Sequence, residues 1–151
     1  MKKKIALLAS ATVLALASTP SMAQFAKSED AIDYRASAML LIGSHFGRMA
    51  PVAKKEIPFD AEQIKANVAI LSVLAKLPWA GFAAAGSEGG DSKDDVWLDP
   101  EGFKQAEDNF LAAIGKLSVA ADSGDFDAFR VAFGNTGKSC KACHDAYRKE
   151  K

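Results

Sequence analysis

Both cysteines of the chain and one of its two histidines fall within five residues near the carboxyl end, Cys140-Lys141-Ala142-Cys143-His144. This CxxCH spacing is typical of covalent c-type haem attachment, in which the two thiols add to the porphyrin vinyl groups and the histidine binds the iron. On a helix the two cysteines lie one turn apart on one face. The motif therefore predicts one haem c, covalently bound through two thioethers, with His144 as an axial iron ligand.

Three other uses of the same residues explain less of the motif. A structural zinc site needs about four ligands, whereas the motif supplies three and only His45 remains as another histidine or cysteine. A thioredoxin-like redox pair requires a βαβ context, and the chain shows no strand pattern. A disulfide between Cys140 and Cys143 would close a very small loop and would leave His144 without a role.

Four segments show the apolar periodicity of amphipathic helices, with capping residues or prolines at their ends. The expected helices run from Ser28 to Pro51, from Asp60 to Leu77, from Asp99 to Ser123, and from Asp125 into the haem motif. We therefore predict an all-α fold, an antiparallel four-helix bundle with the haem attached near the carboxyl end. The long connection over residues 78–98 contains Trp79 and Phe82, and we expect it to wrap one edge of the haem.

The amino terminus has the pattern of a secretory signal peptide. Three lysines precede an apolar run over residues 5–17, and Ser21-Met22-Ala23 forms a small-x-small cleavage site. The run is shorter than the roughly 18 residues of a spanning helix, which disfavours a membrane anchor. We predict a cleaved peptide over 1–23, a mature haem domain over 24–151 with no membrane span, and export to the periplasm. Export is consistent with haem c, which is attached outside the bacterial cytoplasm.

The charge balance disfavours nucleic acid as a partner. The chain has 19 basic and 19 acidic residues, and removal of the three lysines of the signal peptide leaves 16 against 19, a net charge of −3. Basic residues nevertheless surround the haem motif: Lys138, Lys141, Arg148, Lys149 and Lys151. This basic rim has two interpretations, a surface that steers acidic redox partner proteins or a solvated helix end whose cations suit the helix dipole.

Together these features resemble the cytochrome c′ family, exported four-helix-bundle haem proteins with CxxCH near the carboxyl end. The resemblance spans residues 24–151 and is carried by 24–27, 34–35, 44–49, 77–79, 87–90 and 140–148. It implies a homodimer formed through the first two helices, and a five-coordinate, high-spin iron bound from one side only. It also implies that Cys140 and Cys143 form the thioethers and that His144 is the proximal ligand.

The resemblance assigns further residues to the haem surroundings. Arg35 corresponds to an arginine that meets a haem propionate from the first helix, although Ala36 stands where the family commonly has glutamine. Ser87 and Glu88 correspond to a pair in the loop near the haem periphery. Arg148, four residues after His144, corresponds to an arginine beside the proximal pocket.

Met39 corresponds to the residue over the vacant iron face, and two alternatives are open for it. If its sulfur binds iron, the protein is a six-coordinate, low-spin electron carrier. If Met39 only packs there, the iron keeps an open position suited to small neutral gases, in a crowded apolar pocket to which Trp79 also contributes. His45, six residues further along, should point away from the iron.

We therefore expect a protein that binds nitric oxide and carbon monoxide, transfers electrons, or does both. Arg35, Trp79 and the carboxyl-terminal motif favour the five-coordinate state over ligation by Met39. We do not expect an enzyme, because a peroxidase needs an acid–base group over the iron, and neither Met39 nor its neighbours on the helix supply one.

Overall fold

The computed structural model describes residues 24–150, so the predicted signal peptide lies outside the described residues. The four long helices are α1 (Ser28–Gly47), α3 (Ala61–Leu74), α6 (Pro100–Asp122) and α7 (Phe126–Tyr147). Three four-residue helices lie in the connections: α2 (Ala50–Ala53), α4 (Ala80–Ala83) and α5 (Asp95–Leu98). Within residues 24–150 the β-structure consists of a bridge between Ser92 and Arg148. The all-α prediction is confirmed.

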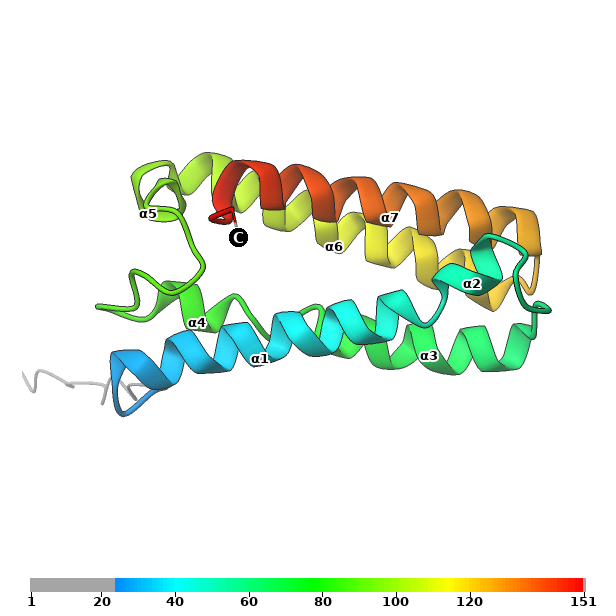
Figure 1. Ribbon diagram of the computed structural model, residues 1–151, viewed down its shortest axis with the longest axis horizontal. Coiled ribbons are helices and arrows are strands. Elements are labelled where there is room, and N and C mark those ends of the chain that lie inside the picture. Colours follow the sequence, from blue (N-terminus) through cyan, green and yellow to red (C-terminus); the bar gives the residue numbers. More distant parts are fainter. Residues whose placement is uncertain (1–23, 151) are drawn as a thin grey trace, which may run out of the picture.

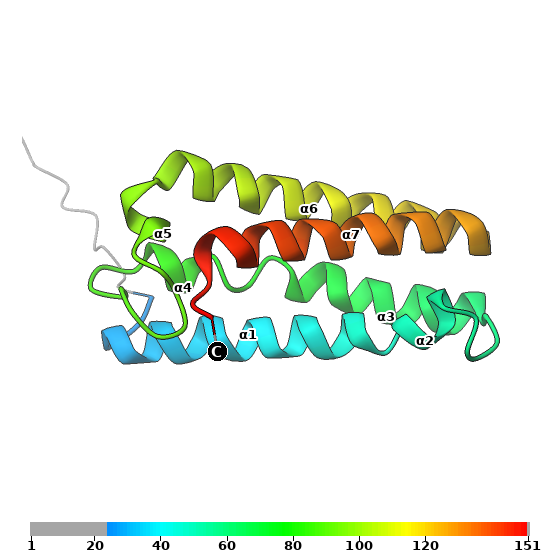
Figure 2. The same cartoon turned by 45° about the horizontal axis from the view of Figure 1, so that its top comes forward.

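The long helices form two layers, with α1 and α3 in one and α6 and α7 in the other (Figure 1). Turning the molecule shows the four helices still side by side, which is the predicted bundle (Figure 2). At one end α2 and the turn between α6 and α7 close the bundle, and at the other end lie α4, α5 and their connections. None of the helices in the described part of the chain is long and apolar enough to cross a membrane.

Three long helices begin at the aspartates that the sequence indicated. The carboxylate oxygens of Asp60, Asp99 and Asp125 accept backbone hydrogen bonds at 3.0, 3.0 and 2.8 Å. Each such cap stabilises its helix by about 1 kcal/mol. The caps fix where α3, α6 and α7 start, and thus the level at which the haem motif of α7 faces the other helices.

The ends of α1 and α3 differ from the predictions. Ser28 does not cap α1 but is its first residue; the backbone N–H of Lys27 instead donates to the Asp30 carboxylate at 3.2 Å. Asp30 in the first turn thus accepts from the backbone N–H of the residue that precedes the helix. α1 ends at Gly47, before Pro51, which lies in the first turn of α2. α3 ends at Leu74 rather than Leu77, since turns precede Pro78.

The hydrophobic core fills the end of the bundle near α2. Leu71, Leu117 and Phe129 are fully buried there. The rings of Phe46 and Phe133 stack with centroids 4.2 Å apart, which joins α1 to α7 at the edge of this core. The buried core residues that α1 and α7 contribute come from the carboxyl half of α1 and the amino half of α7, and α3 and α6 supply most of the others. The opposite halves of these two helices remain available for a ligand.

Two valines of α3 test where the core lies. Val68 is 1% exposed and Val73 is 63% exposed. We predict that Val68→Ala lowers the free energy of unfolding by about 2 kcal/mol, because it removes two methyl groups from a packed interior. Val73→Ala should change it by no more than about 0.5 kcal/mol. Denaturant unfolding of the haem-loaded protein measures both, and equal effects would contradict this assignment of the core.

Candidate haem site

A cavity of about 640 Å³ lies between α1 and α7 at the end of the bundle near α4 and α5. Its volume is within the range of cofactor pockets. It is lined by Arg35, Ala36, Ser37, Met39, Leu40, Gly43, Ser44, Phe82, Asp91, Ser92, Val96, Phe103, Cys143, His144, Tyr147 and Arg148. Besides Cys143 and His144, three of the predicted site residues line this cavity: Arg35 and Met39 from α1, and Arg148 after α7.

The last turn of α7 supplies one wall. Cys143, His144 and Tyr147 line the cavity at helical spacing. Cys140, one turn earlier, is half-buried and packs against the hydrophobic core. Burial raises the pKa of both thiols, which keeps them in the neutral form. The motif is therefore positioned at the border between the core and the cavity, where a tethered cofactor would enter the space beside α1.

The His144 ring borders the cavity with much of its surface exposed. Partial desolvation by the surrounding protein and the nearby charge of Arg148 lower its pKa, while Asp145 opposes them. A lower pKa favours the neutral imidazole, the form whose nitrogen lone pair binds a metal. The electrostatic surroundings of His144 therefore suit an iron ligand.

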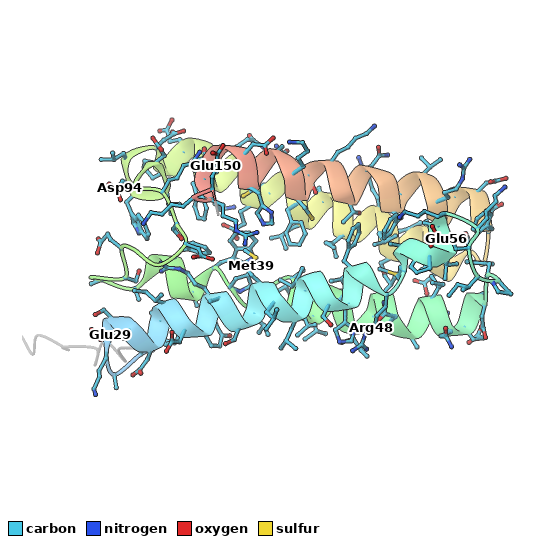
Figure 3. The ribbon with its side chains drawn as sticks, viewed as in Figure 1. Glu29, Met39, Arg48, Glu56, Asp94 and Glu150 are labelled. Atoms are coloured by element: carbon cyan, nitrogen blue, oxygen red, sulfur yellow. The ribbon has the colours of Figure 1, made fainter. Side chains whose placement is uncertain are left out.

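The facing wall is a stripe of α1. Ala36, Met39, Leu40 and Gly43 lie along it, and none of these side chains carries a charge. Met39 is half-buried and points from α1 into the space between the helix layers (Figure 3). Leu40 is 74% exposed although it borders the cavity, so a bound apolar group would remove it from water. This stripe offers sulfur and hydrocarbon opposite the haem motif, and the polar residues Arg35, Ser37 and Ser44 of α1 line the cavity beside it.

Arg35 is only 3% exposed and its guanidinium is engaged by the connection between α3 and α6. Nη1 donates to the carbonyls of Gly81 and Ser87 at 2.8 and 2.6 Å, and Nη2 donates to that of Gly89 at 2.9 Å. Burial lowers the pKa of Arg35 and the charge of Glu88 raises it, but the group remains protonated. Arg35 therefore lines the cavity with several of its donors already used, and its contact with a propionate stays a prediction.

Ser87, Glu88 and Trp79 are not among the residues that line the cavity. The buried Ser87 contributes its carbonyl to Arg35, and its hydroxyl donates to the carbonyl of Phe82 at 3.3 Å. Glu88 is exposed. Trp79 packs on Phe82 with ring centroids 6.2 Å apart, and its Nε1 donates to the Ala75 carbonyl at 2.8 Å. Direct contact of these three residues with a cofactor stays a prediction.

His45 pairs with a side chain of α3. Its Nδ1 pairs with Oδ1 of Asn67 at 2.7 Å, and the Asn67 amide donates back to the His45 carbonyl at 2.8 Å. The ring thus joins α1 to α3 and does not line the cavity. Across residues 24–150, no group of three or more His, Cys, Asp or Glu side chains is arranged to hold a metal ion. The zinc interpretation of the motif therefore gains no support from the geometry.

The sequence did not indicate that the chain after the haem motif pairs with the connection before α5. The N–H of Lys93 donates to the Tyr147 carbonyl, and the N–H of Lys149 donates to the Asp91 carbonyl, both at 2.9 Å. The bridge between Ser92 and Arg148 lies between these two bonds. These backbone bonds hold Asp91 and Ser92 where they line the cavity. The sequence could not predict this pairing, because a single bridge is too short to produce the alternating pattern of a strand.

Tyr147 joins the end of α7 to the start of α6. Its hydroxyl donates to Oδ2 of Asp99 at 3.1 Å, and its ring lies edge-on to that of Phe103 with centroids 5.3 Å apart. Gly102 makes room for this contact, because a Cβ there would lie 2.6 Å from the tyrosine oxygen and 2.1 Å from Asp99 Oδ2. The absent side chain allows one aspartate to cap α6 and hold Tyr147.

The residues present fit a c-type haem. The thiol of Cys143 and the imidazole of His144 line one side of a mainly apolar cavity, with Cys140 one turn earlier on the same helix, and the cationic side chains of Arg35 and Arg148 border it. Such cations suit the carboxylates of haem propionates.

The sequence family described as Cytochrome C′ matches residues 30–148. A cytochrome c′ of Alcaligenes xylosoxydans xylosoxydans is 59% identical over 128 residues, covering 85% of this chain and all of that protein. Two solved structures of variants of cytochrome c prime from Alcaligenes xylosoxidans are also similar. A nitric oxide complex has a TM-score of 0.83 at 58% identity, covering 85% of this chain and all of that one. A carbon monoxide complex has a TM-score of 0.82 at 57% identity, covering 84% and 100%.

Two glycines of α6 test the contact between Asp99 and Tyr147. Alanine in a helix interior is favoured over glycine by about 1 kcal/mol, and a Cβ at Gly115 meets nothing within 4 Å. We predict that Gly115→Ala stabilises the protein by about this amount. Gly102→Ala should instead destabilise it by about 1 kcal/mol, because the Asp99 carboxylate must leave its capping position. Thermal unfolding of the haem-loaded protein measures both; equal stabilisation would contradict the proposed close contact.

Proposed function

The chain belongs to the cytochrome c′ family, and we propose that it binds nitric oxide and carbon monoxide at a five-coordinate haem iron in the periplasm. Haem c is the cofactor of this family, and the CxxCH motif fits its attachment. The observation that carries the proposal is the pair of walls around one cavity: His144 lies on α7, and an uncharged stripe containing Met39 lies on α1.

In this proposal Cys140 and Cys143 hold the porphyrin and His144 binds the iron from the α7 side. When bound, the haem iron supplies the coordination position that a diatomic gas occupies. The residues of the chain determine access to that position. In this proposal the bound gas faces Ala36, Met39 and Gly43 rather than Ser37 and Ser44, which also line the cavity. The side chains of these three residues offer no hydrogen-bond donor, so a neutral gas that needs none is favoured over dioxygen.

Several features of the surroundings agree with this function. Similar proteins of the family have been captured with nitric oxide and with carbon monoxide. The uncharged wall of α1 provides no acid–base group of the kind a peroxidase needs, and we therefore propose a binding protein rather than an enzyme. We propose residues 24–151 as the mature single domain, exported by a signal peptide over 1–23.

A homodimer is also part of the proposal. Leu41 on α1 and Ile70 and Val73 on α3 are large apolar side chains with 47%, 49% and 63% exposure. These helices lie in one layer of the bundle (Figure 1), so a partner could cover both. This agrees with the dimer through the first two helices that the family resemblance implies.

Electron transfer is the second candidate function, because Met39 faces the same cavity as His144. If its sulfur bound iron, the site would be closed to gases and would suit an electron carrier. The basic rim around the haem motif gives weaker support for docking of an acidic redox partner than the sequence indicated, because three of its cations already have partners within the chain. Lys141 lies 2.6 Å from Asp145, Arg148 lies 4.0 Å from Asp91, and Lys149 Nζ donates to the Gly90 carbonyl at 3.0 Å.

Visible absorption of the purified, haem-loaded protein separates the two functions. A five-coordinate iron gives high-spin spectra, and the reduced protein changes its Soret band when carbon monoxide is added. Low-spin bands with a sulfur-to-iron charge-transfer feature and no response to carbon monoxide would overturn the gas-binding proposal in favour of the electron carrier.

Substitutions of Met39 distinguish packing from ligation. If Met39 only crowds the iron face, Met39→Ala leaves the spin state unchanged. Carbon monoxide then associates about tenfold faster or more, as expected if the barrier falls by about 1.4 kcal/mol. Met39→Leu is the matched control, since it keeps the volume and removes the sulfur; its spectra and rates should resemble those of the unmodified protein. A change of spin state in both variants would identify Met39 as a ligand.

A further inference from the structure

The connection between α3 and α6 is held against α1 by one side chain. Three carbonyls of this connection, from Gly81, Ser87 and Gly89, converge on the guanidinium of Arg35 at 2.6 to 2.9 Å. The same guanidinium lies over the rings of Phe82 and Trp97, at 4.7 and 5.4 Å from their centroids. These five contacts span residues 81–97, which include much of the loop wall of the cavity.

Two glycines let this connection approach α1 closely. A Cβ at Gly81 would lie 2.6 Å from the carbonyl oxygen of Ala31 and 2.9 Å from Cβ of Arg35. A Cβ at Gly90 would lie 2.9 Å from Cγ2 of Ile32, and Gly90 has a φ of +59°, which favours glycine. The backbone of the connection therefore lies close against α1 at Gly81 and at Gly90, the two ends of the stretch whose carbonyls accept from Arg35.

The held connection is itself bonded to the chain after the haem motif. The amides of Lys93 and Lys149 donate to the carbonyls of Tyr147 and Asp91, and Lys93 Nζ donates to the carbonyl of Asp145 at 2.8 Å. A continuous set of contacts thus runs from α1 through the connection to the end of α7. The views agree that the carboxyl end lies in the space between α7 and α1 (Figures 1 and 2).

We propose that Arg35 is a positioning residue, whose planar fork fixes the loop wall of the haem cavity and, through it, the carboxyl end of α7. The proposal rests on the proposed haem function. A guanidinium has five N–H donors, of which three serve the loop carbonyls here, so any contact with a propionate uses those that remain. The fork geometry, rather than the positive charge alone, is what the three carbonyls require, and lysine does not reproduce it.

The test measures hydrogen exchange at the amides of Lys93 and Lys149 in the haem-loaded protein. Arg35→Lys keeps the charge and Arg35→Met removes it. We expect both variants to speed exchange at these amides by about tenfold or more, as the loss of a charge-assisted hydrogen bond predicts. The matched control is Arg48→Lys. Arg48 is an exposed arginine directly after α1, thirteen residues beyond Arg35, and it lines no part of the cavity, so this variant should leave exchange unchanged.

Slow exchange in Arg35→Lys with fast exchange in Arg35→Met would overturn the proposal, because charge alone would then suffice. Unchanged exchange in both variants would also overturn it. If neither variant accumulates with haem, Gly81→Ala is the second test variant. It forces the connection away from α1 while Arg35 itself is unchanged. It should speed exchange at the same two amides, and unchanged exchange there would refute the coupling. Carbon monoxide binding by the unmodified protein decides the proposed function separately.

Discussion

The helical spacing of Cys140, Cys143 and His144 imposes the constraint on which the rest of the structure depends. A planar cofactor fixed to one face of α7 requires a space beside that face, at the level of the last turns. The hydrophobic core accordingly occupies the other end of the bundle, where Leu117 and Phe129 are fully buried. The cavity between α1 and α7 fills the end that remains, and its volume of about 640 Å³ suits a cofactor.

The two walls of the cavity have different chemistry, and this difference supports gas binding. The α7 wall presents an imidazole whose pKa is lowered by partial desolvation and by Arg148, so the ring is suited to bind iron. The α1 wall presents Met39 and small uncharged residues. The charged Arg35 borders the same space, yet three loop carbonyls engage its donors. Its bonds to the loop leave Arg35 fewer donors for a ligand, while Ser37 and Ser44 are the other polar residues that α1 brings to the cavity.

Much of this arrangement was predictable from the sequence because it follows from local signals. The aspartate caps and the apolar periodicity determine three of the four helix starts, and CxxCH determines the attachment site. The connection between α3 and α6 was not predictable in detail. Its shape depends on Arg35, distant in sequence from the carbonyls it holds, and on backbone pairing of Ser92 with Arg148. Trp79 shows what the sequence alone could not predict. Its apolar character indicated a packed side chain, but the sequence did not indicate that Phe82 would line the cavity while Trp79 packs on Phe82.

Acid–acetone extraction of the exported, mature protein tests the central claim most directly. If the porphyrin is joined through thioethers to Cys140 and Cys143, the colour remains with the precipitated polypeptide. Pigment that moves into the organic phase, or a mature protein without colour, would contradict covalent attachment. In that case the cavity beside His144 would need another occupant.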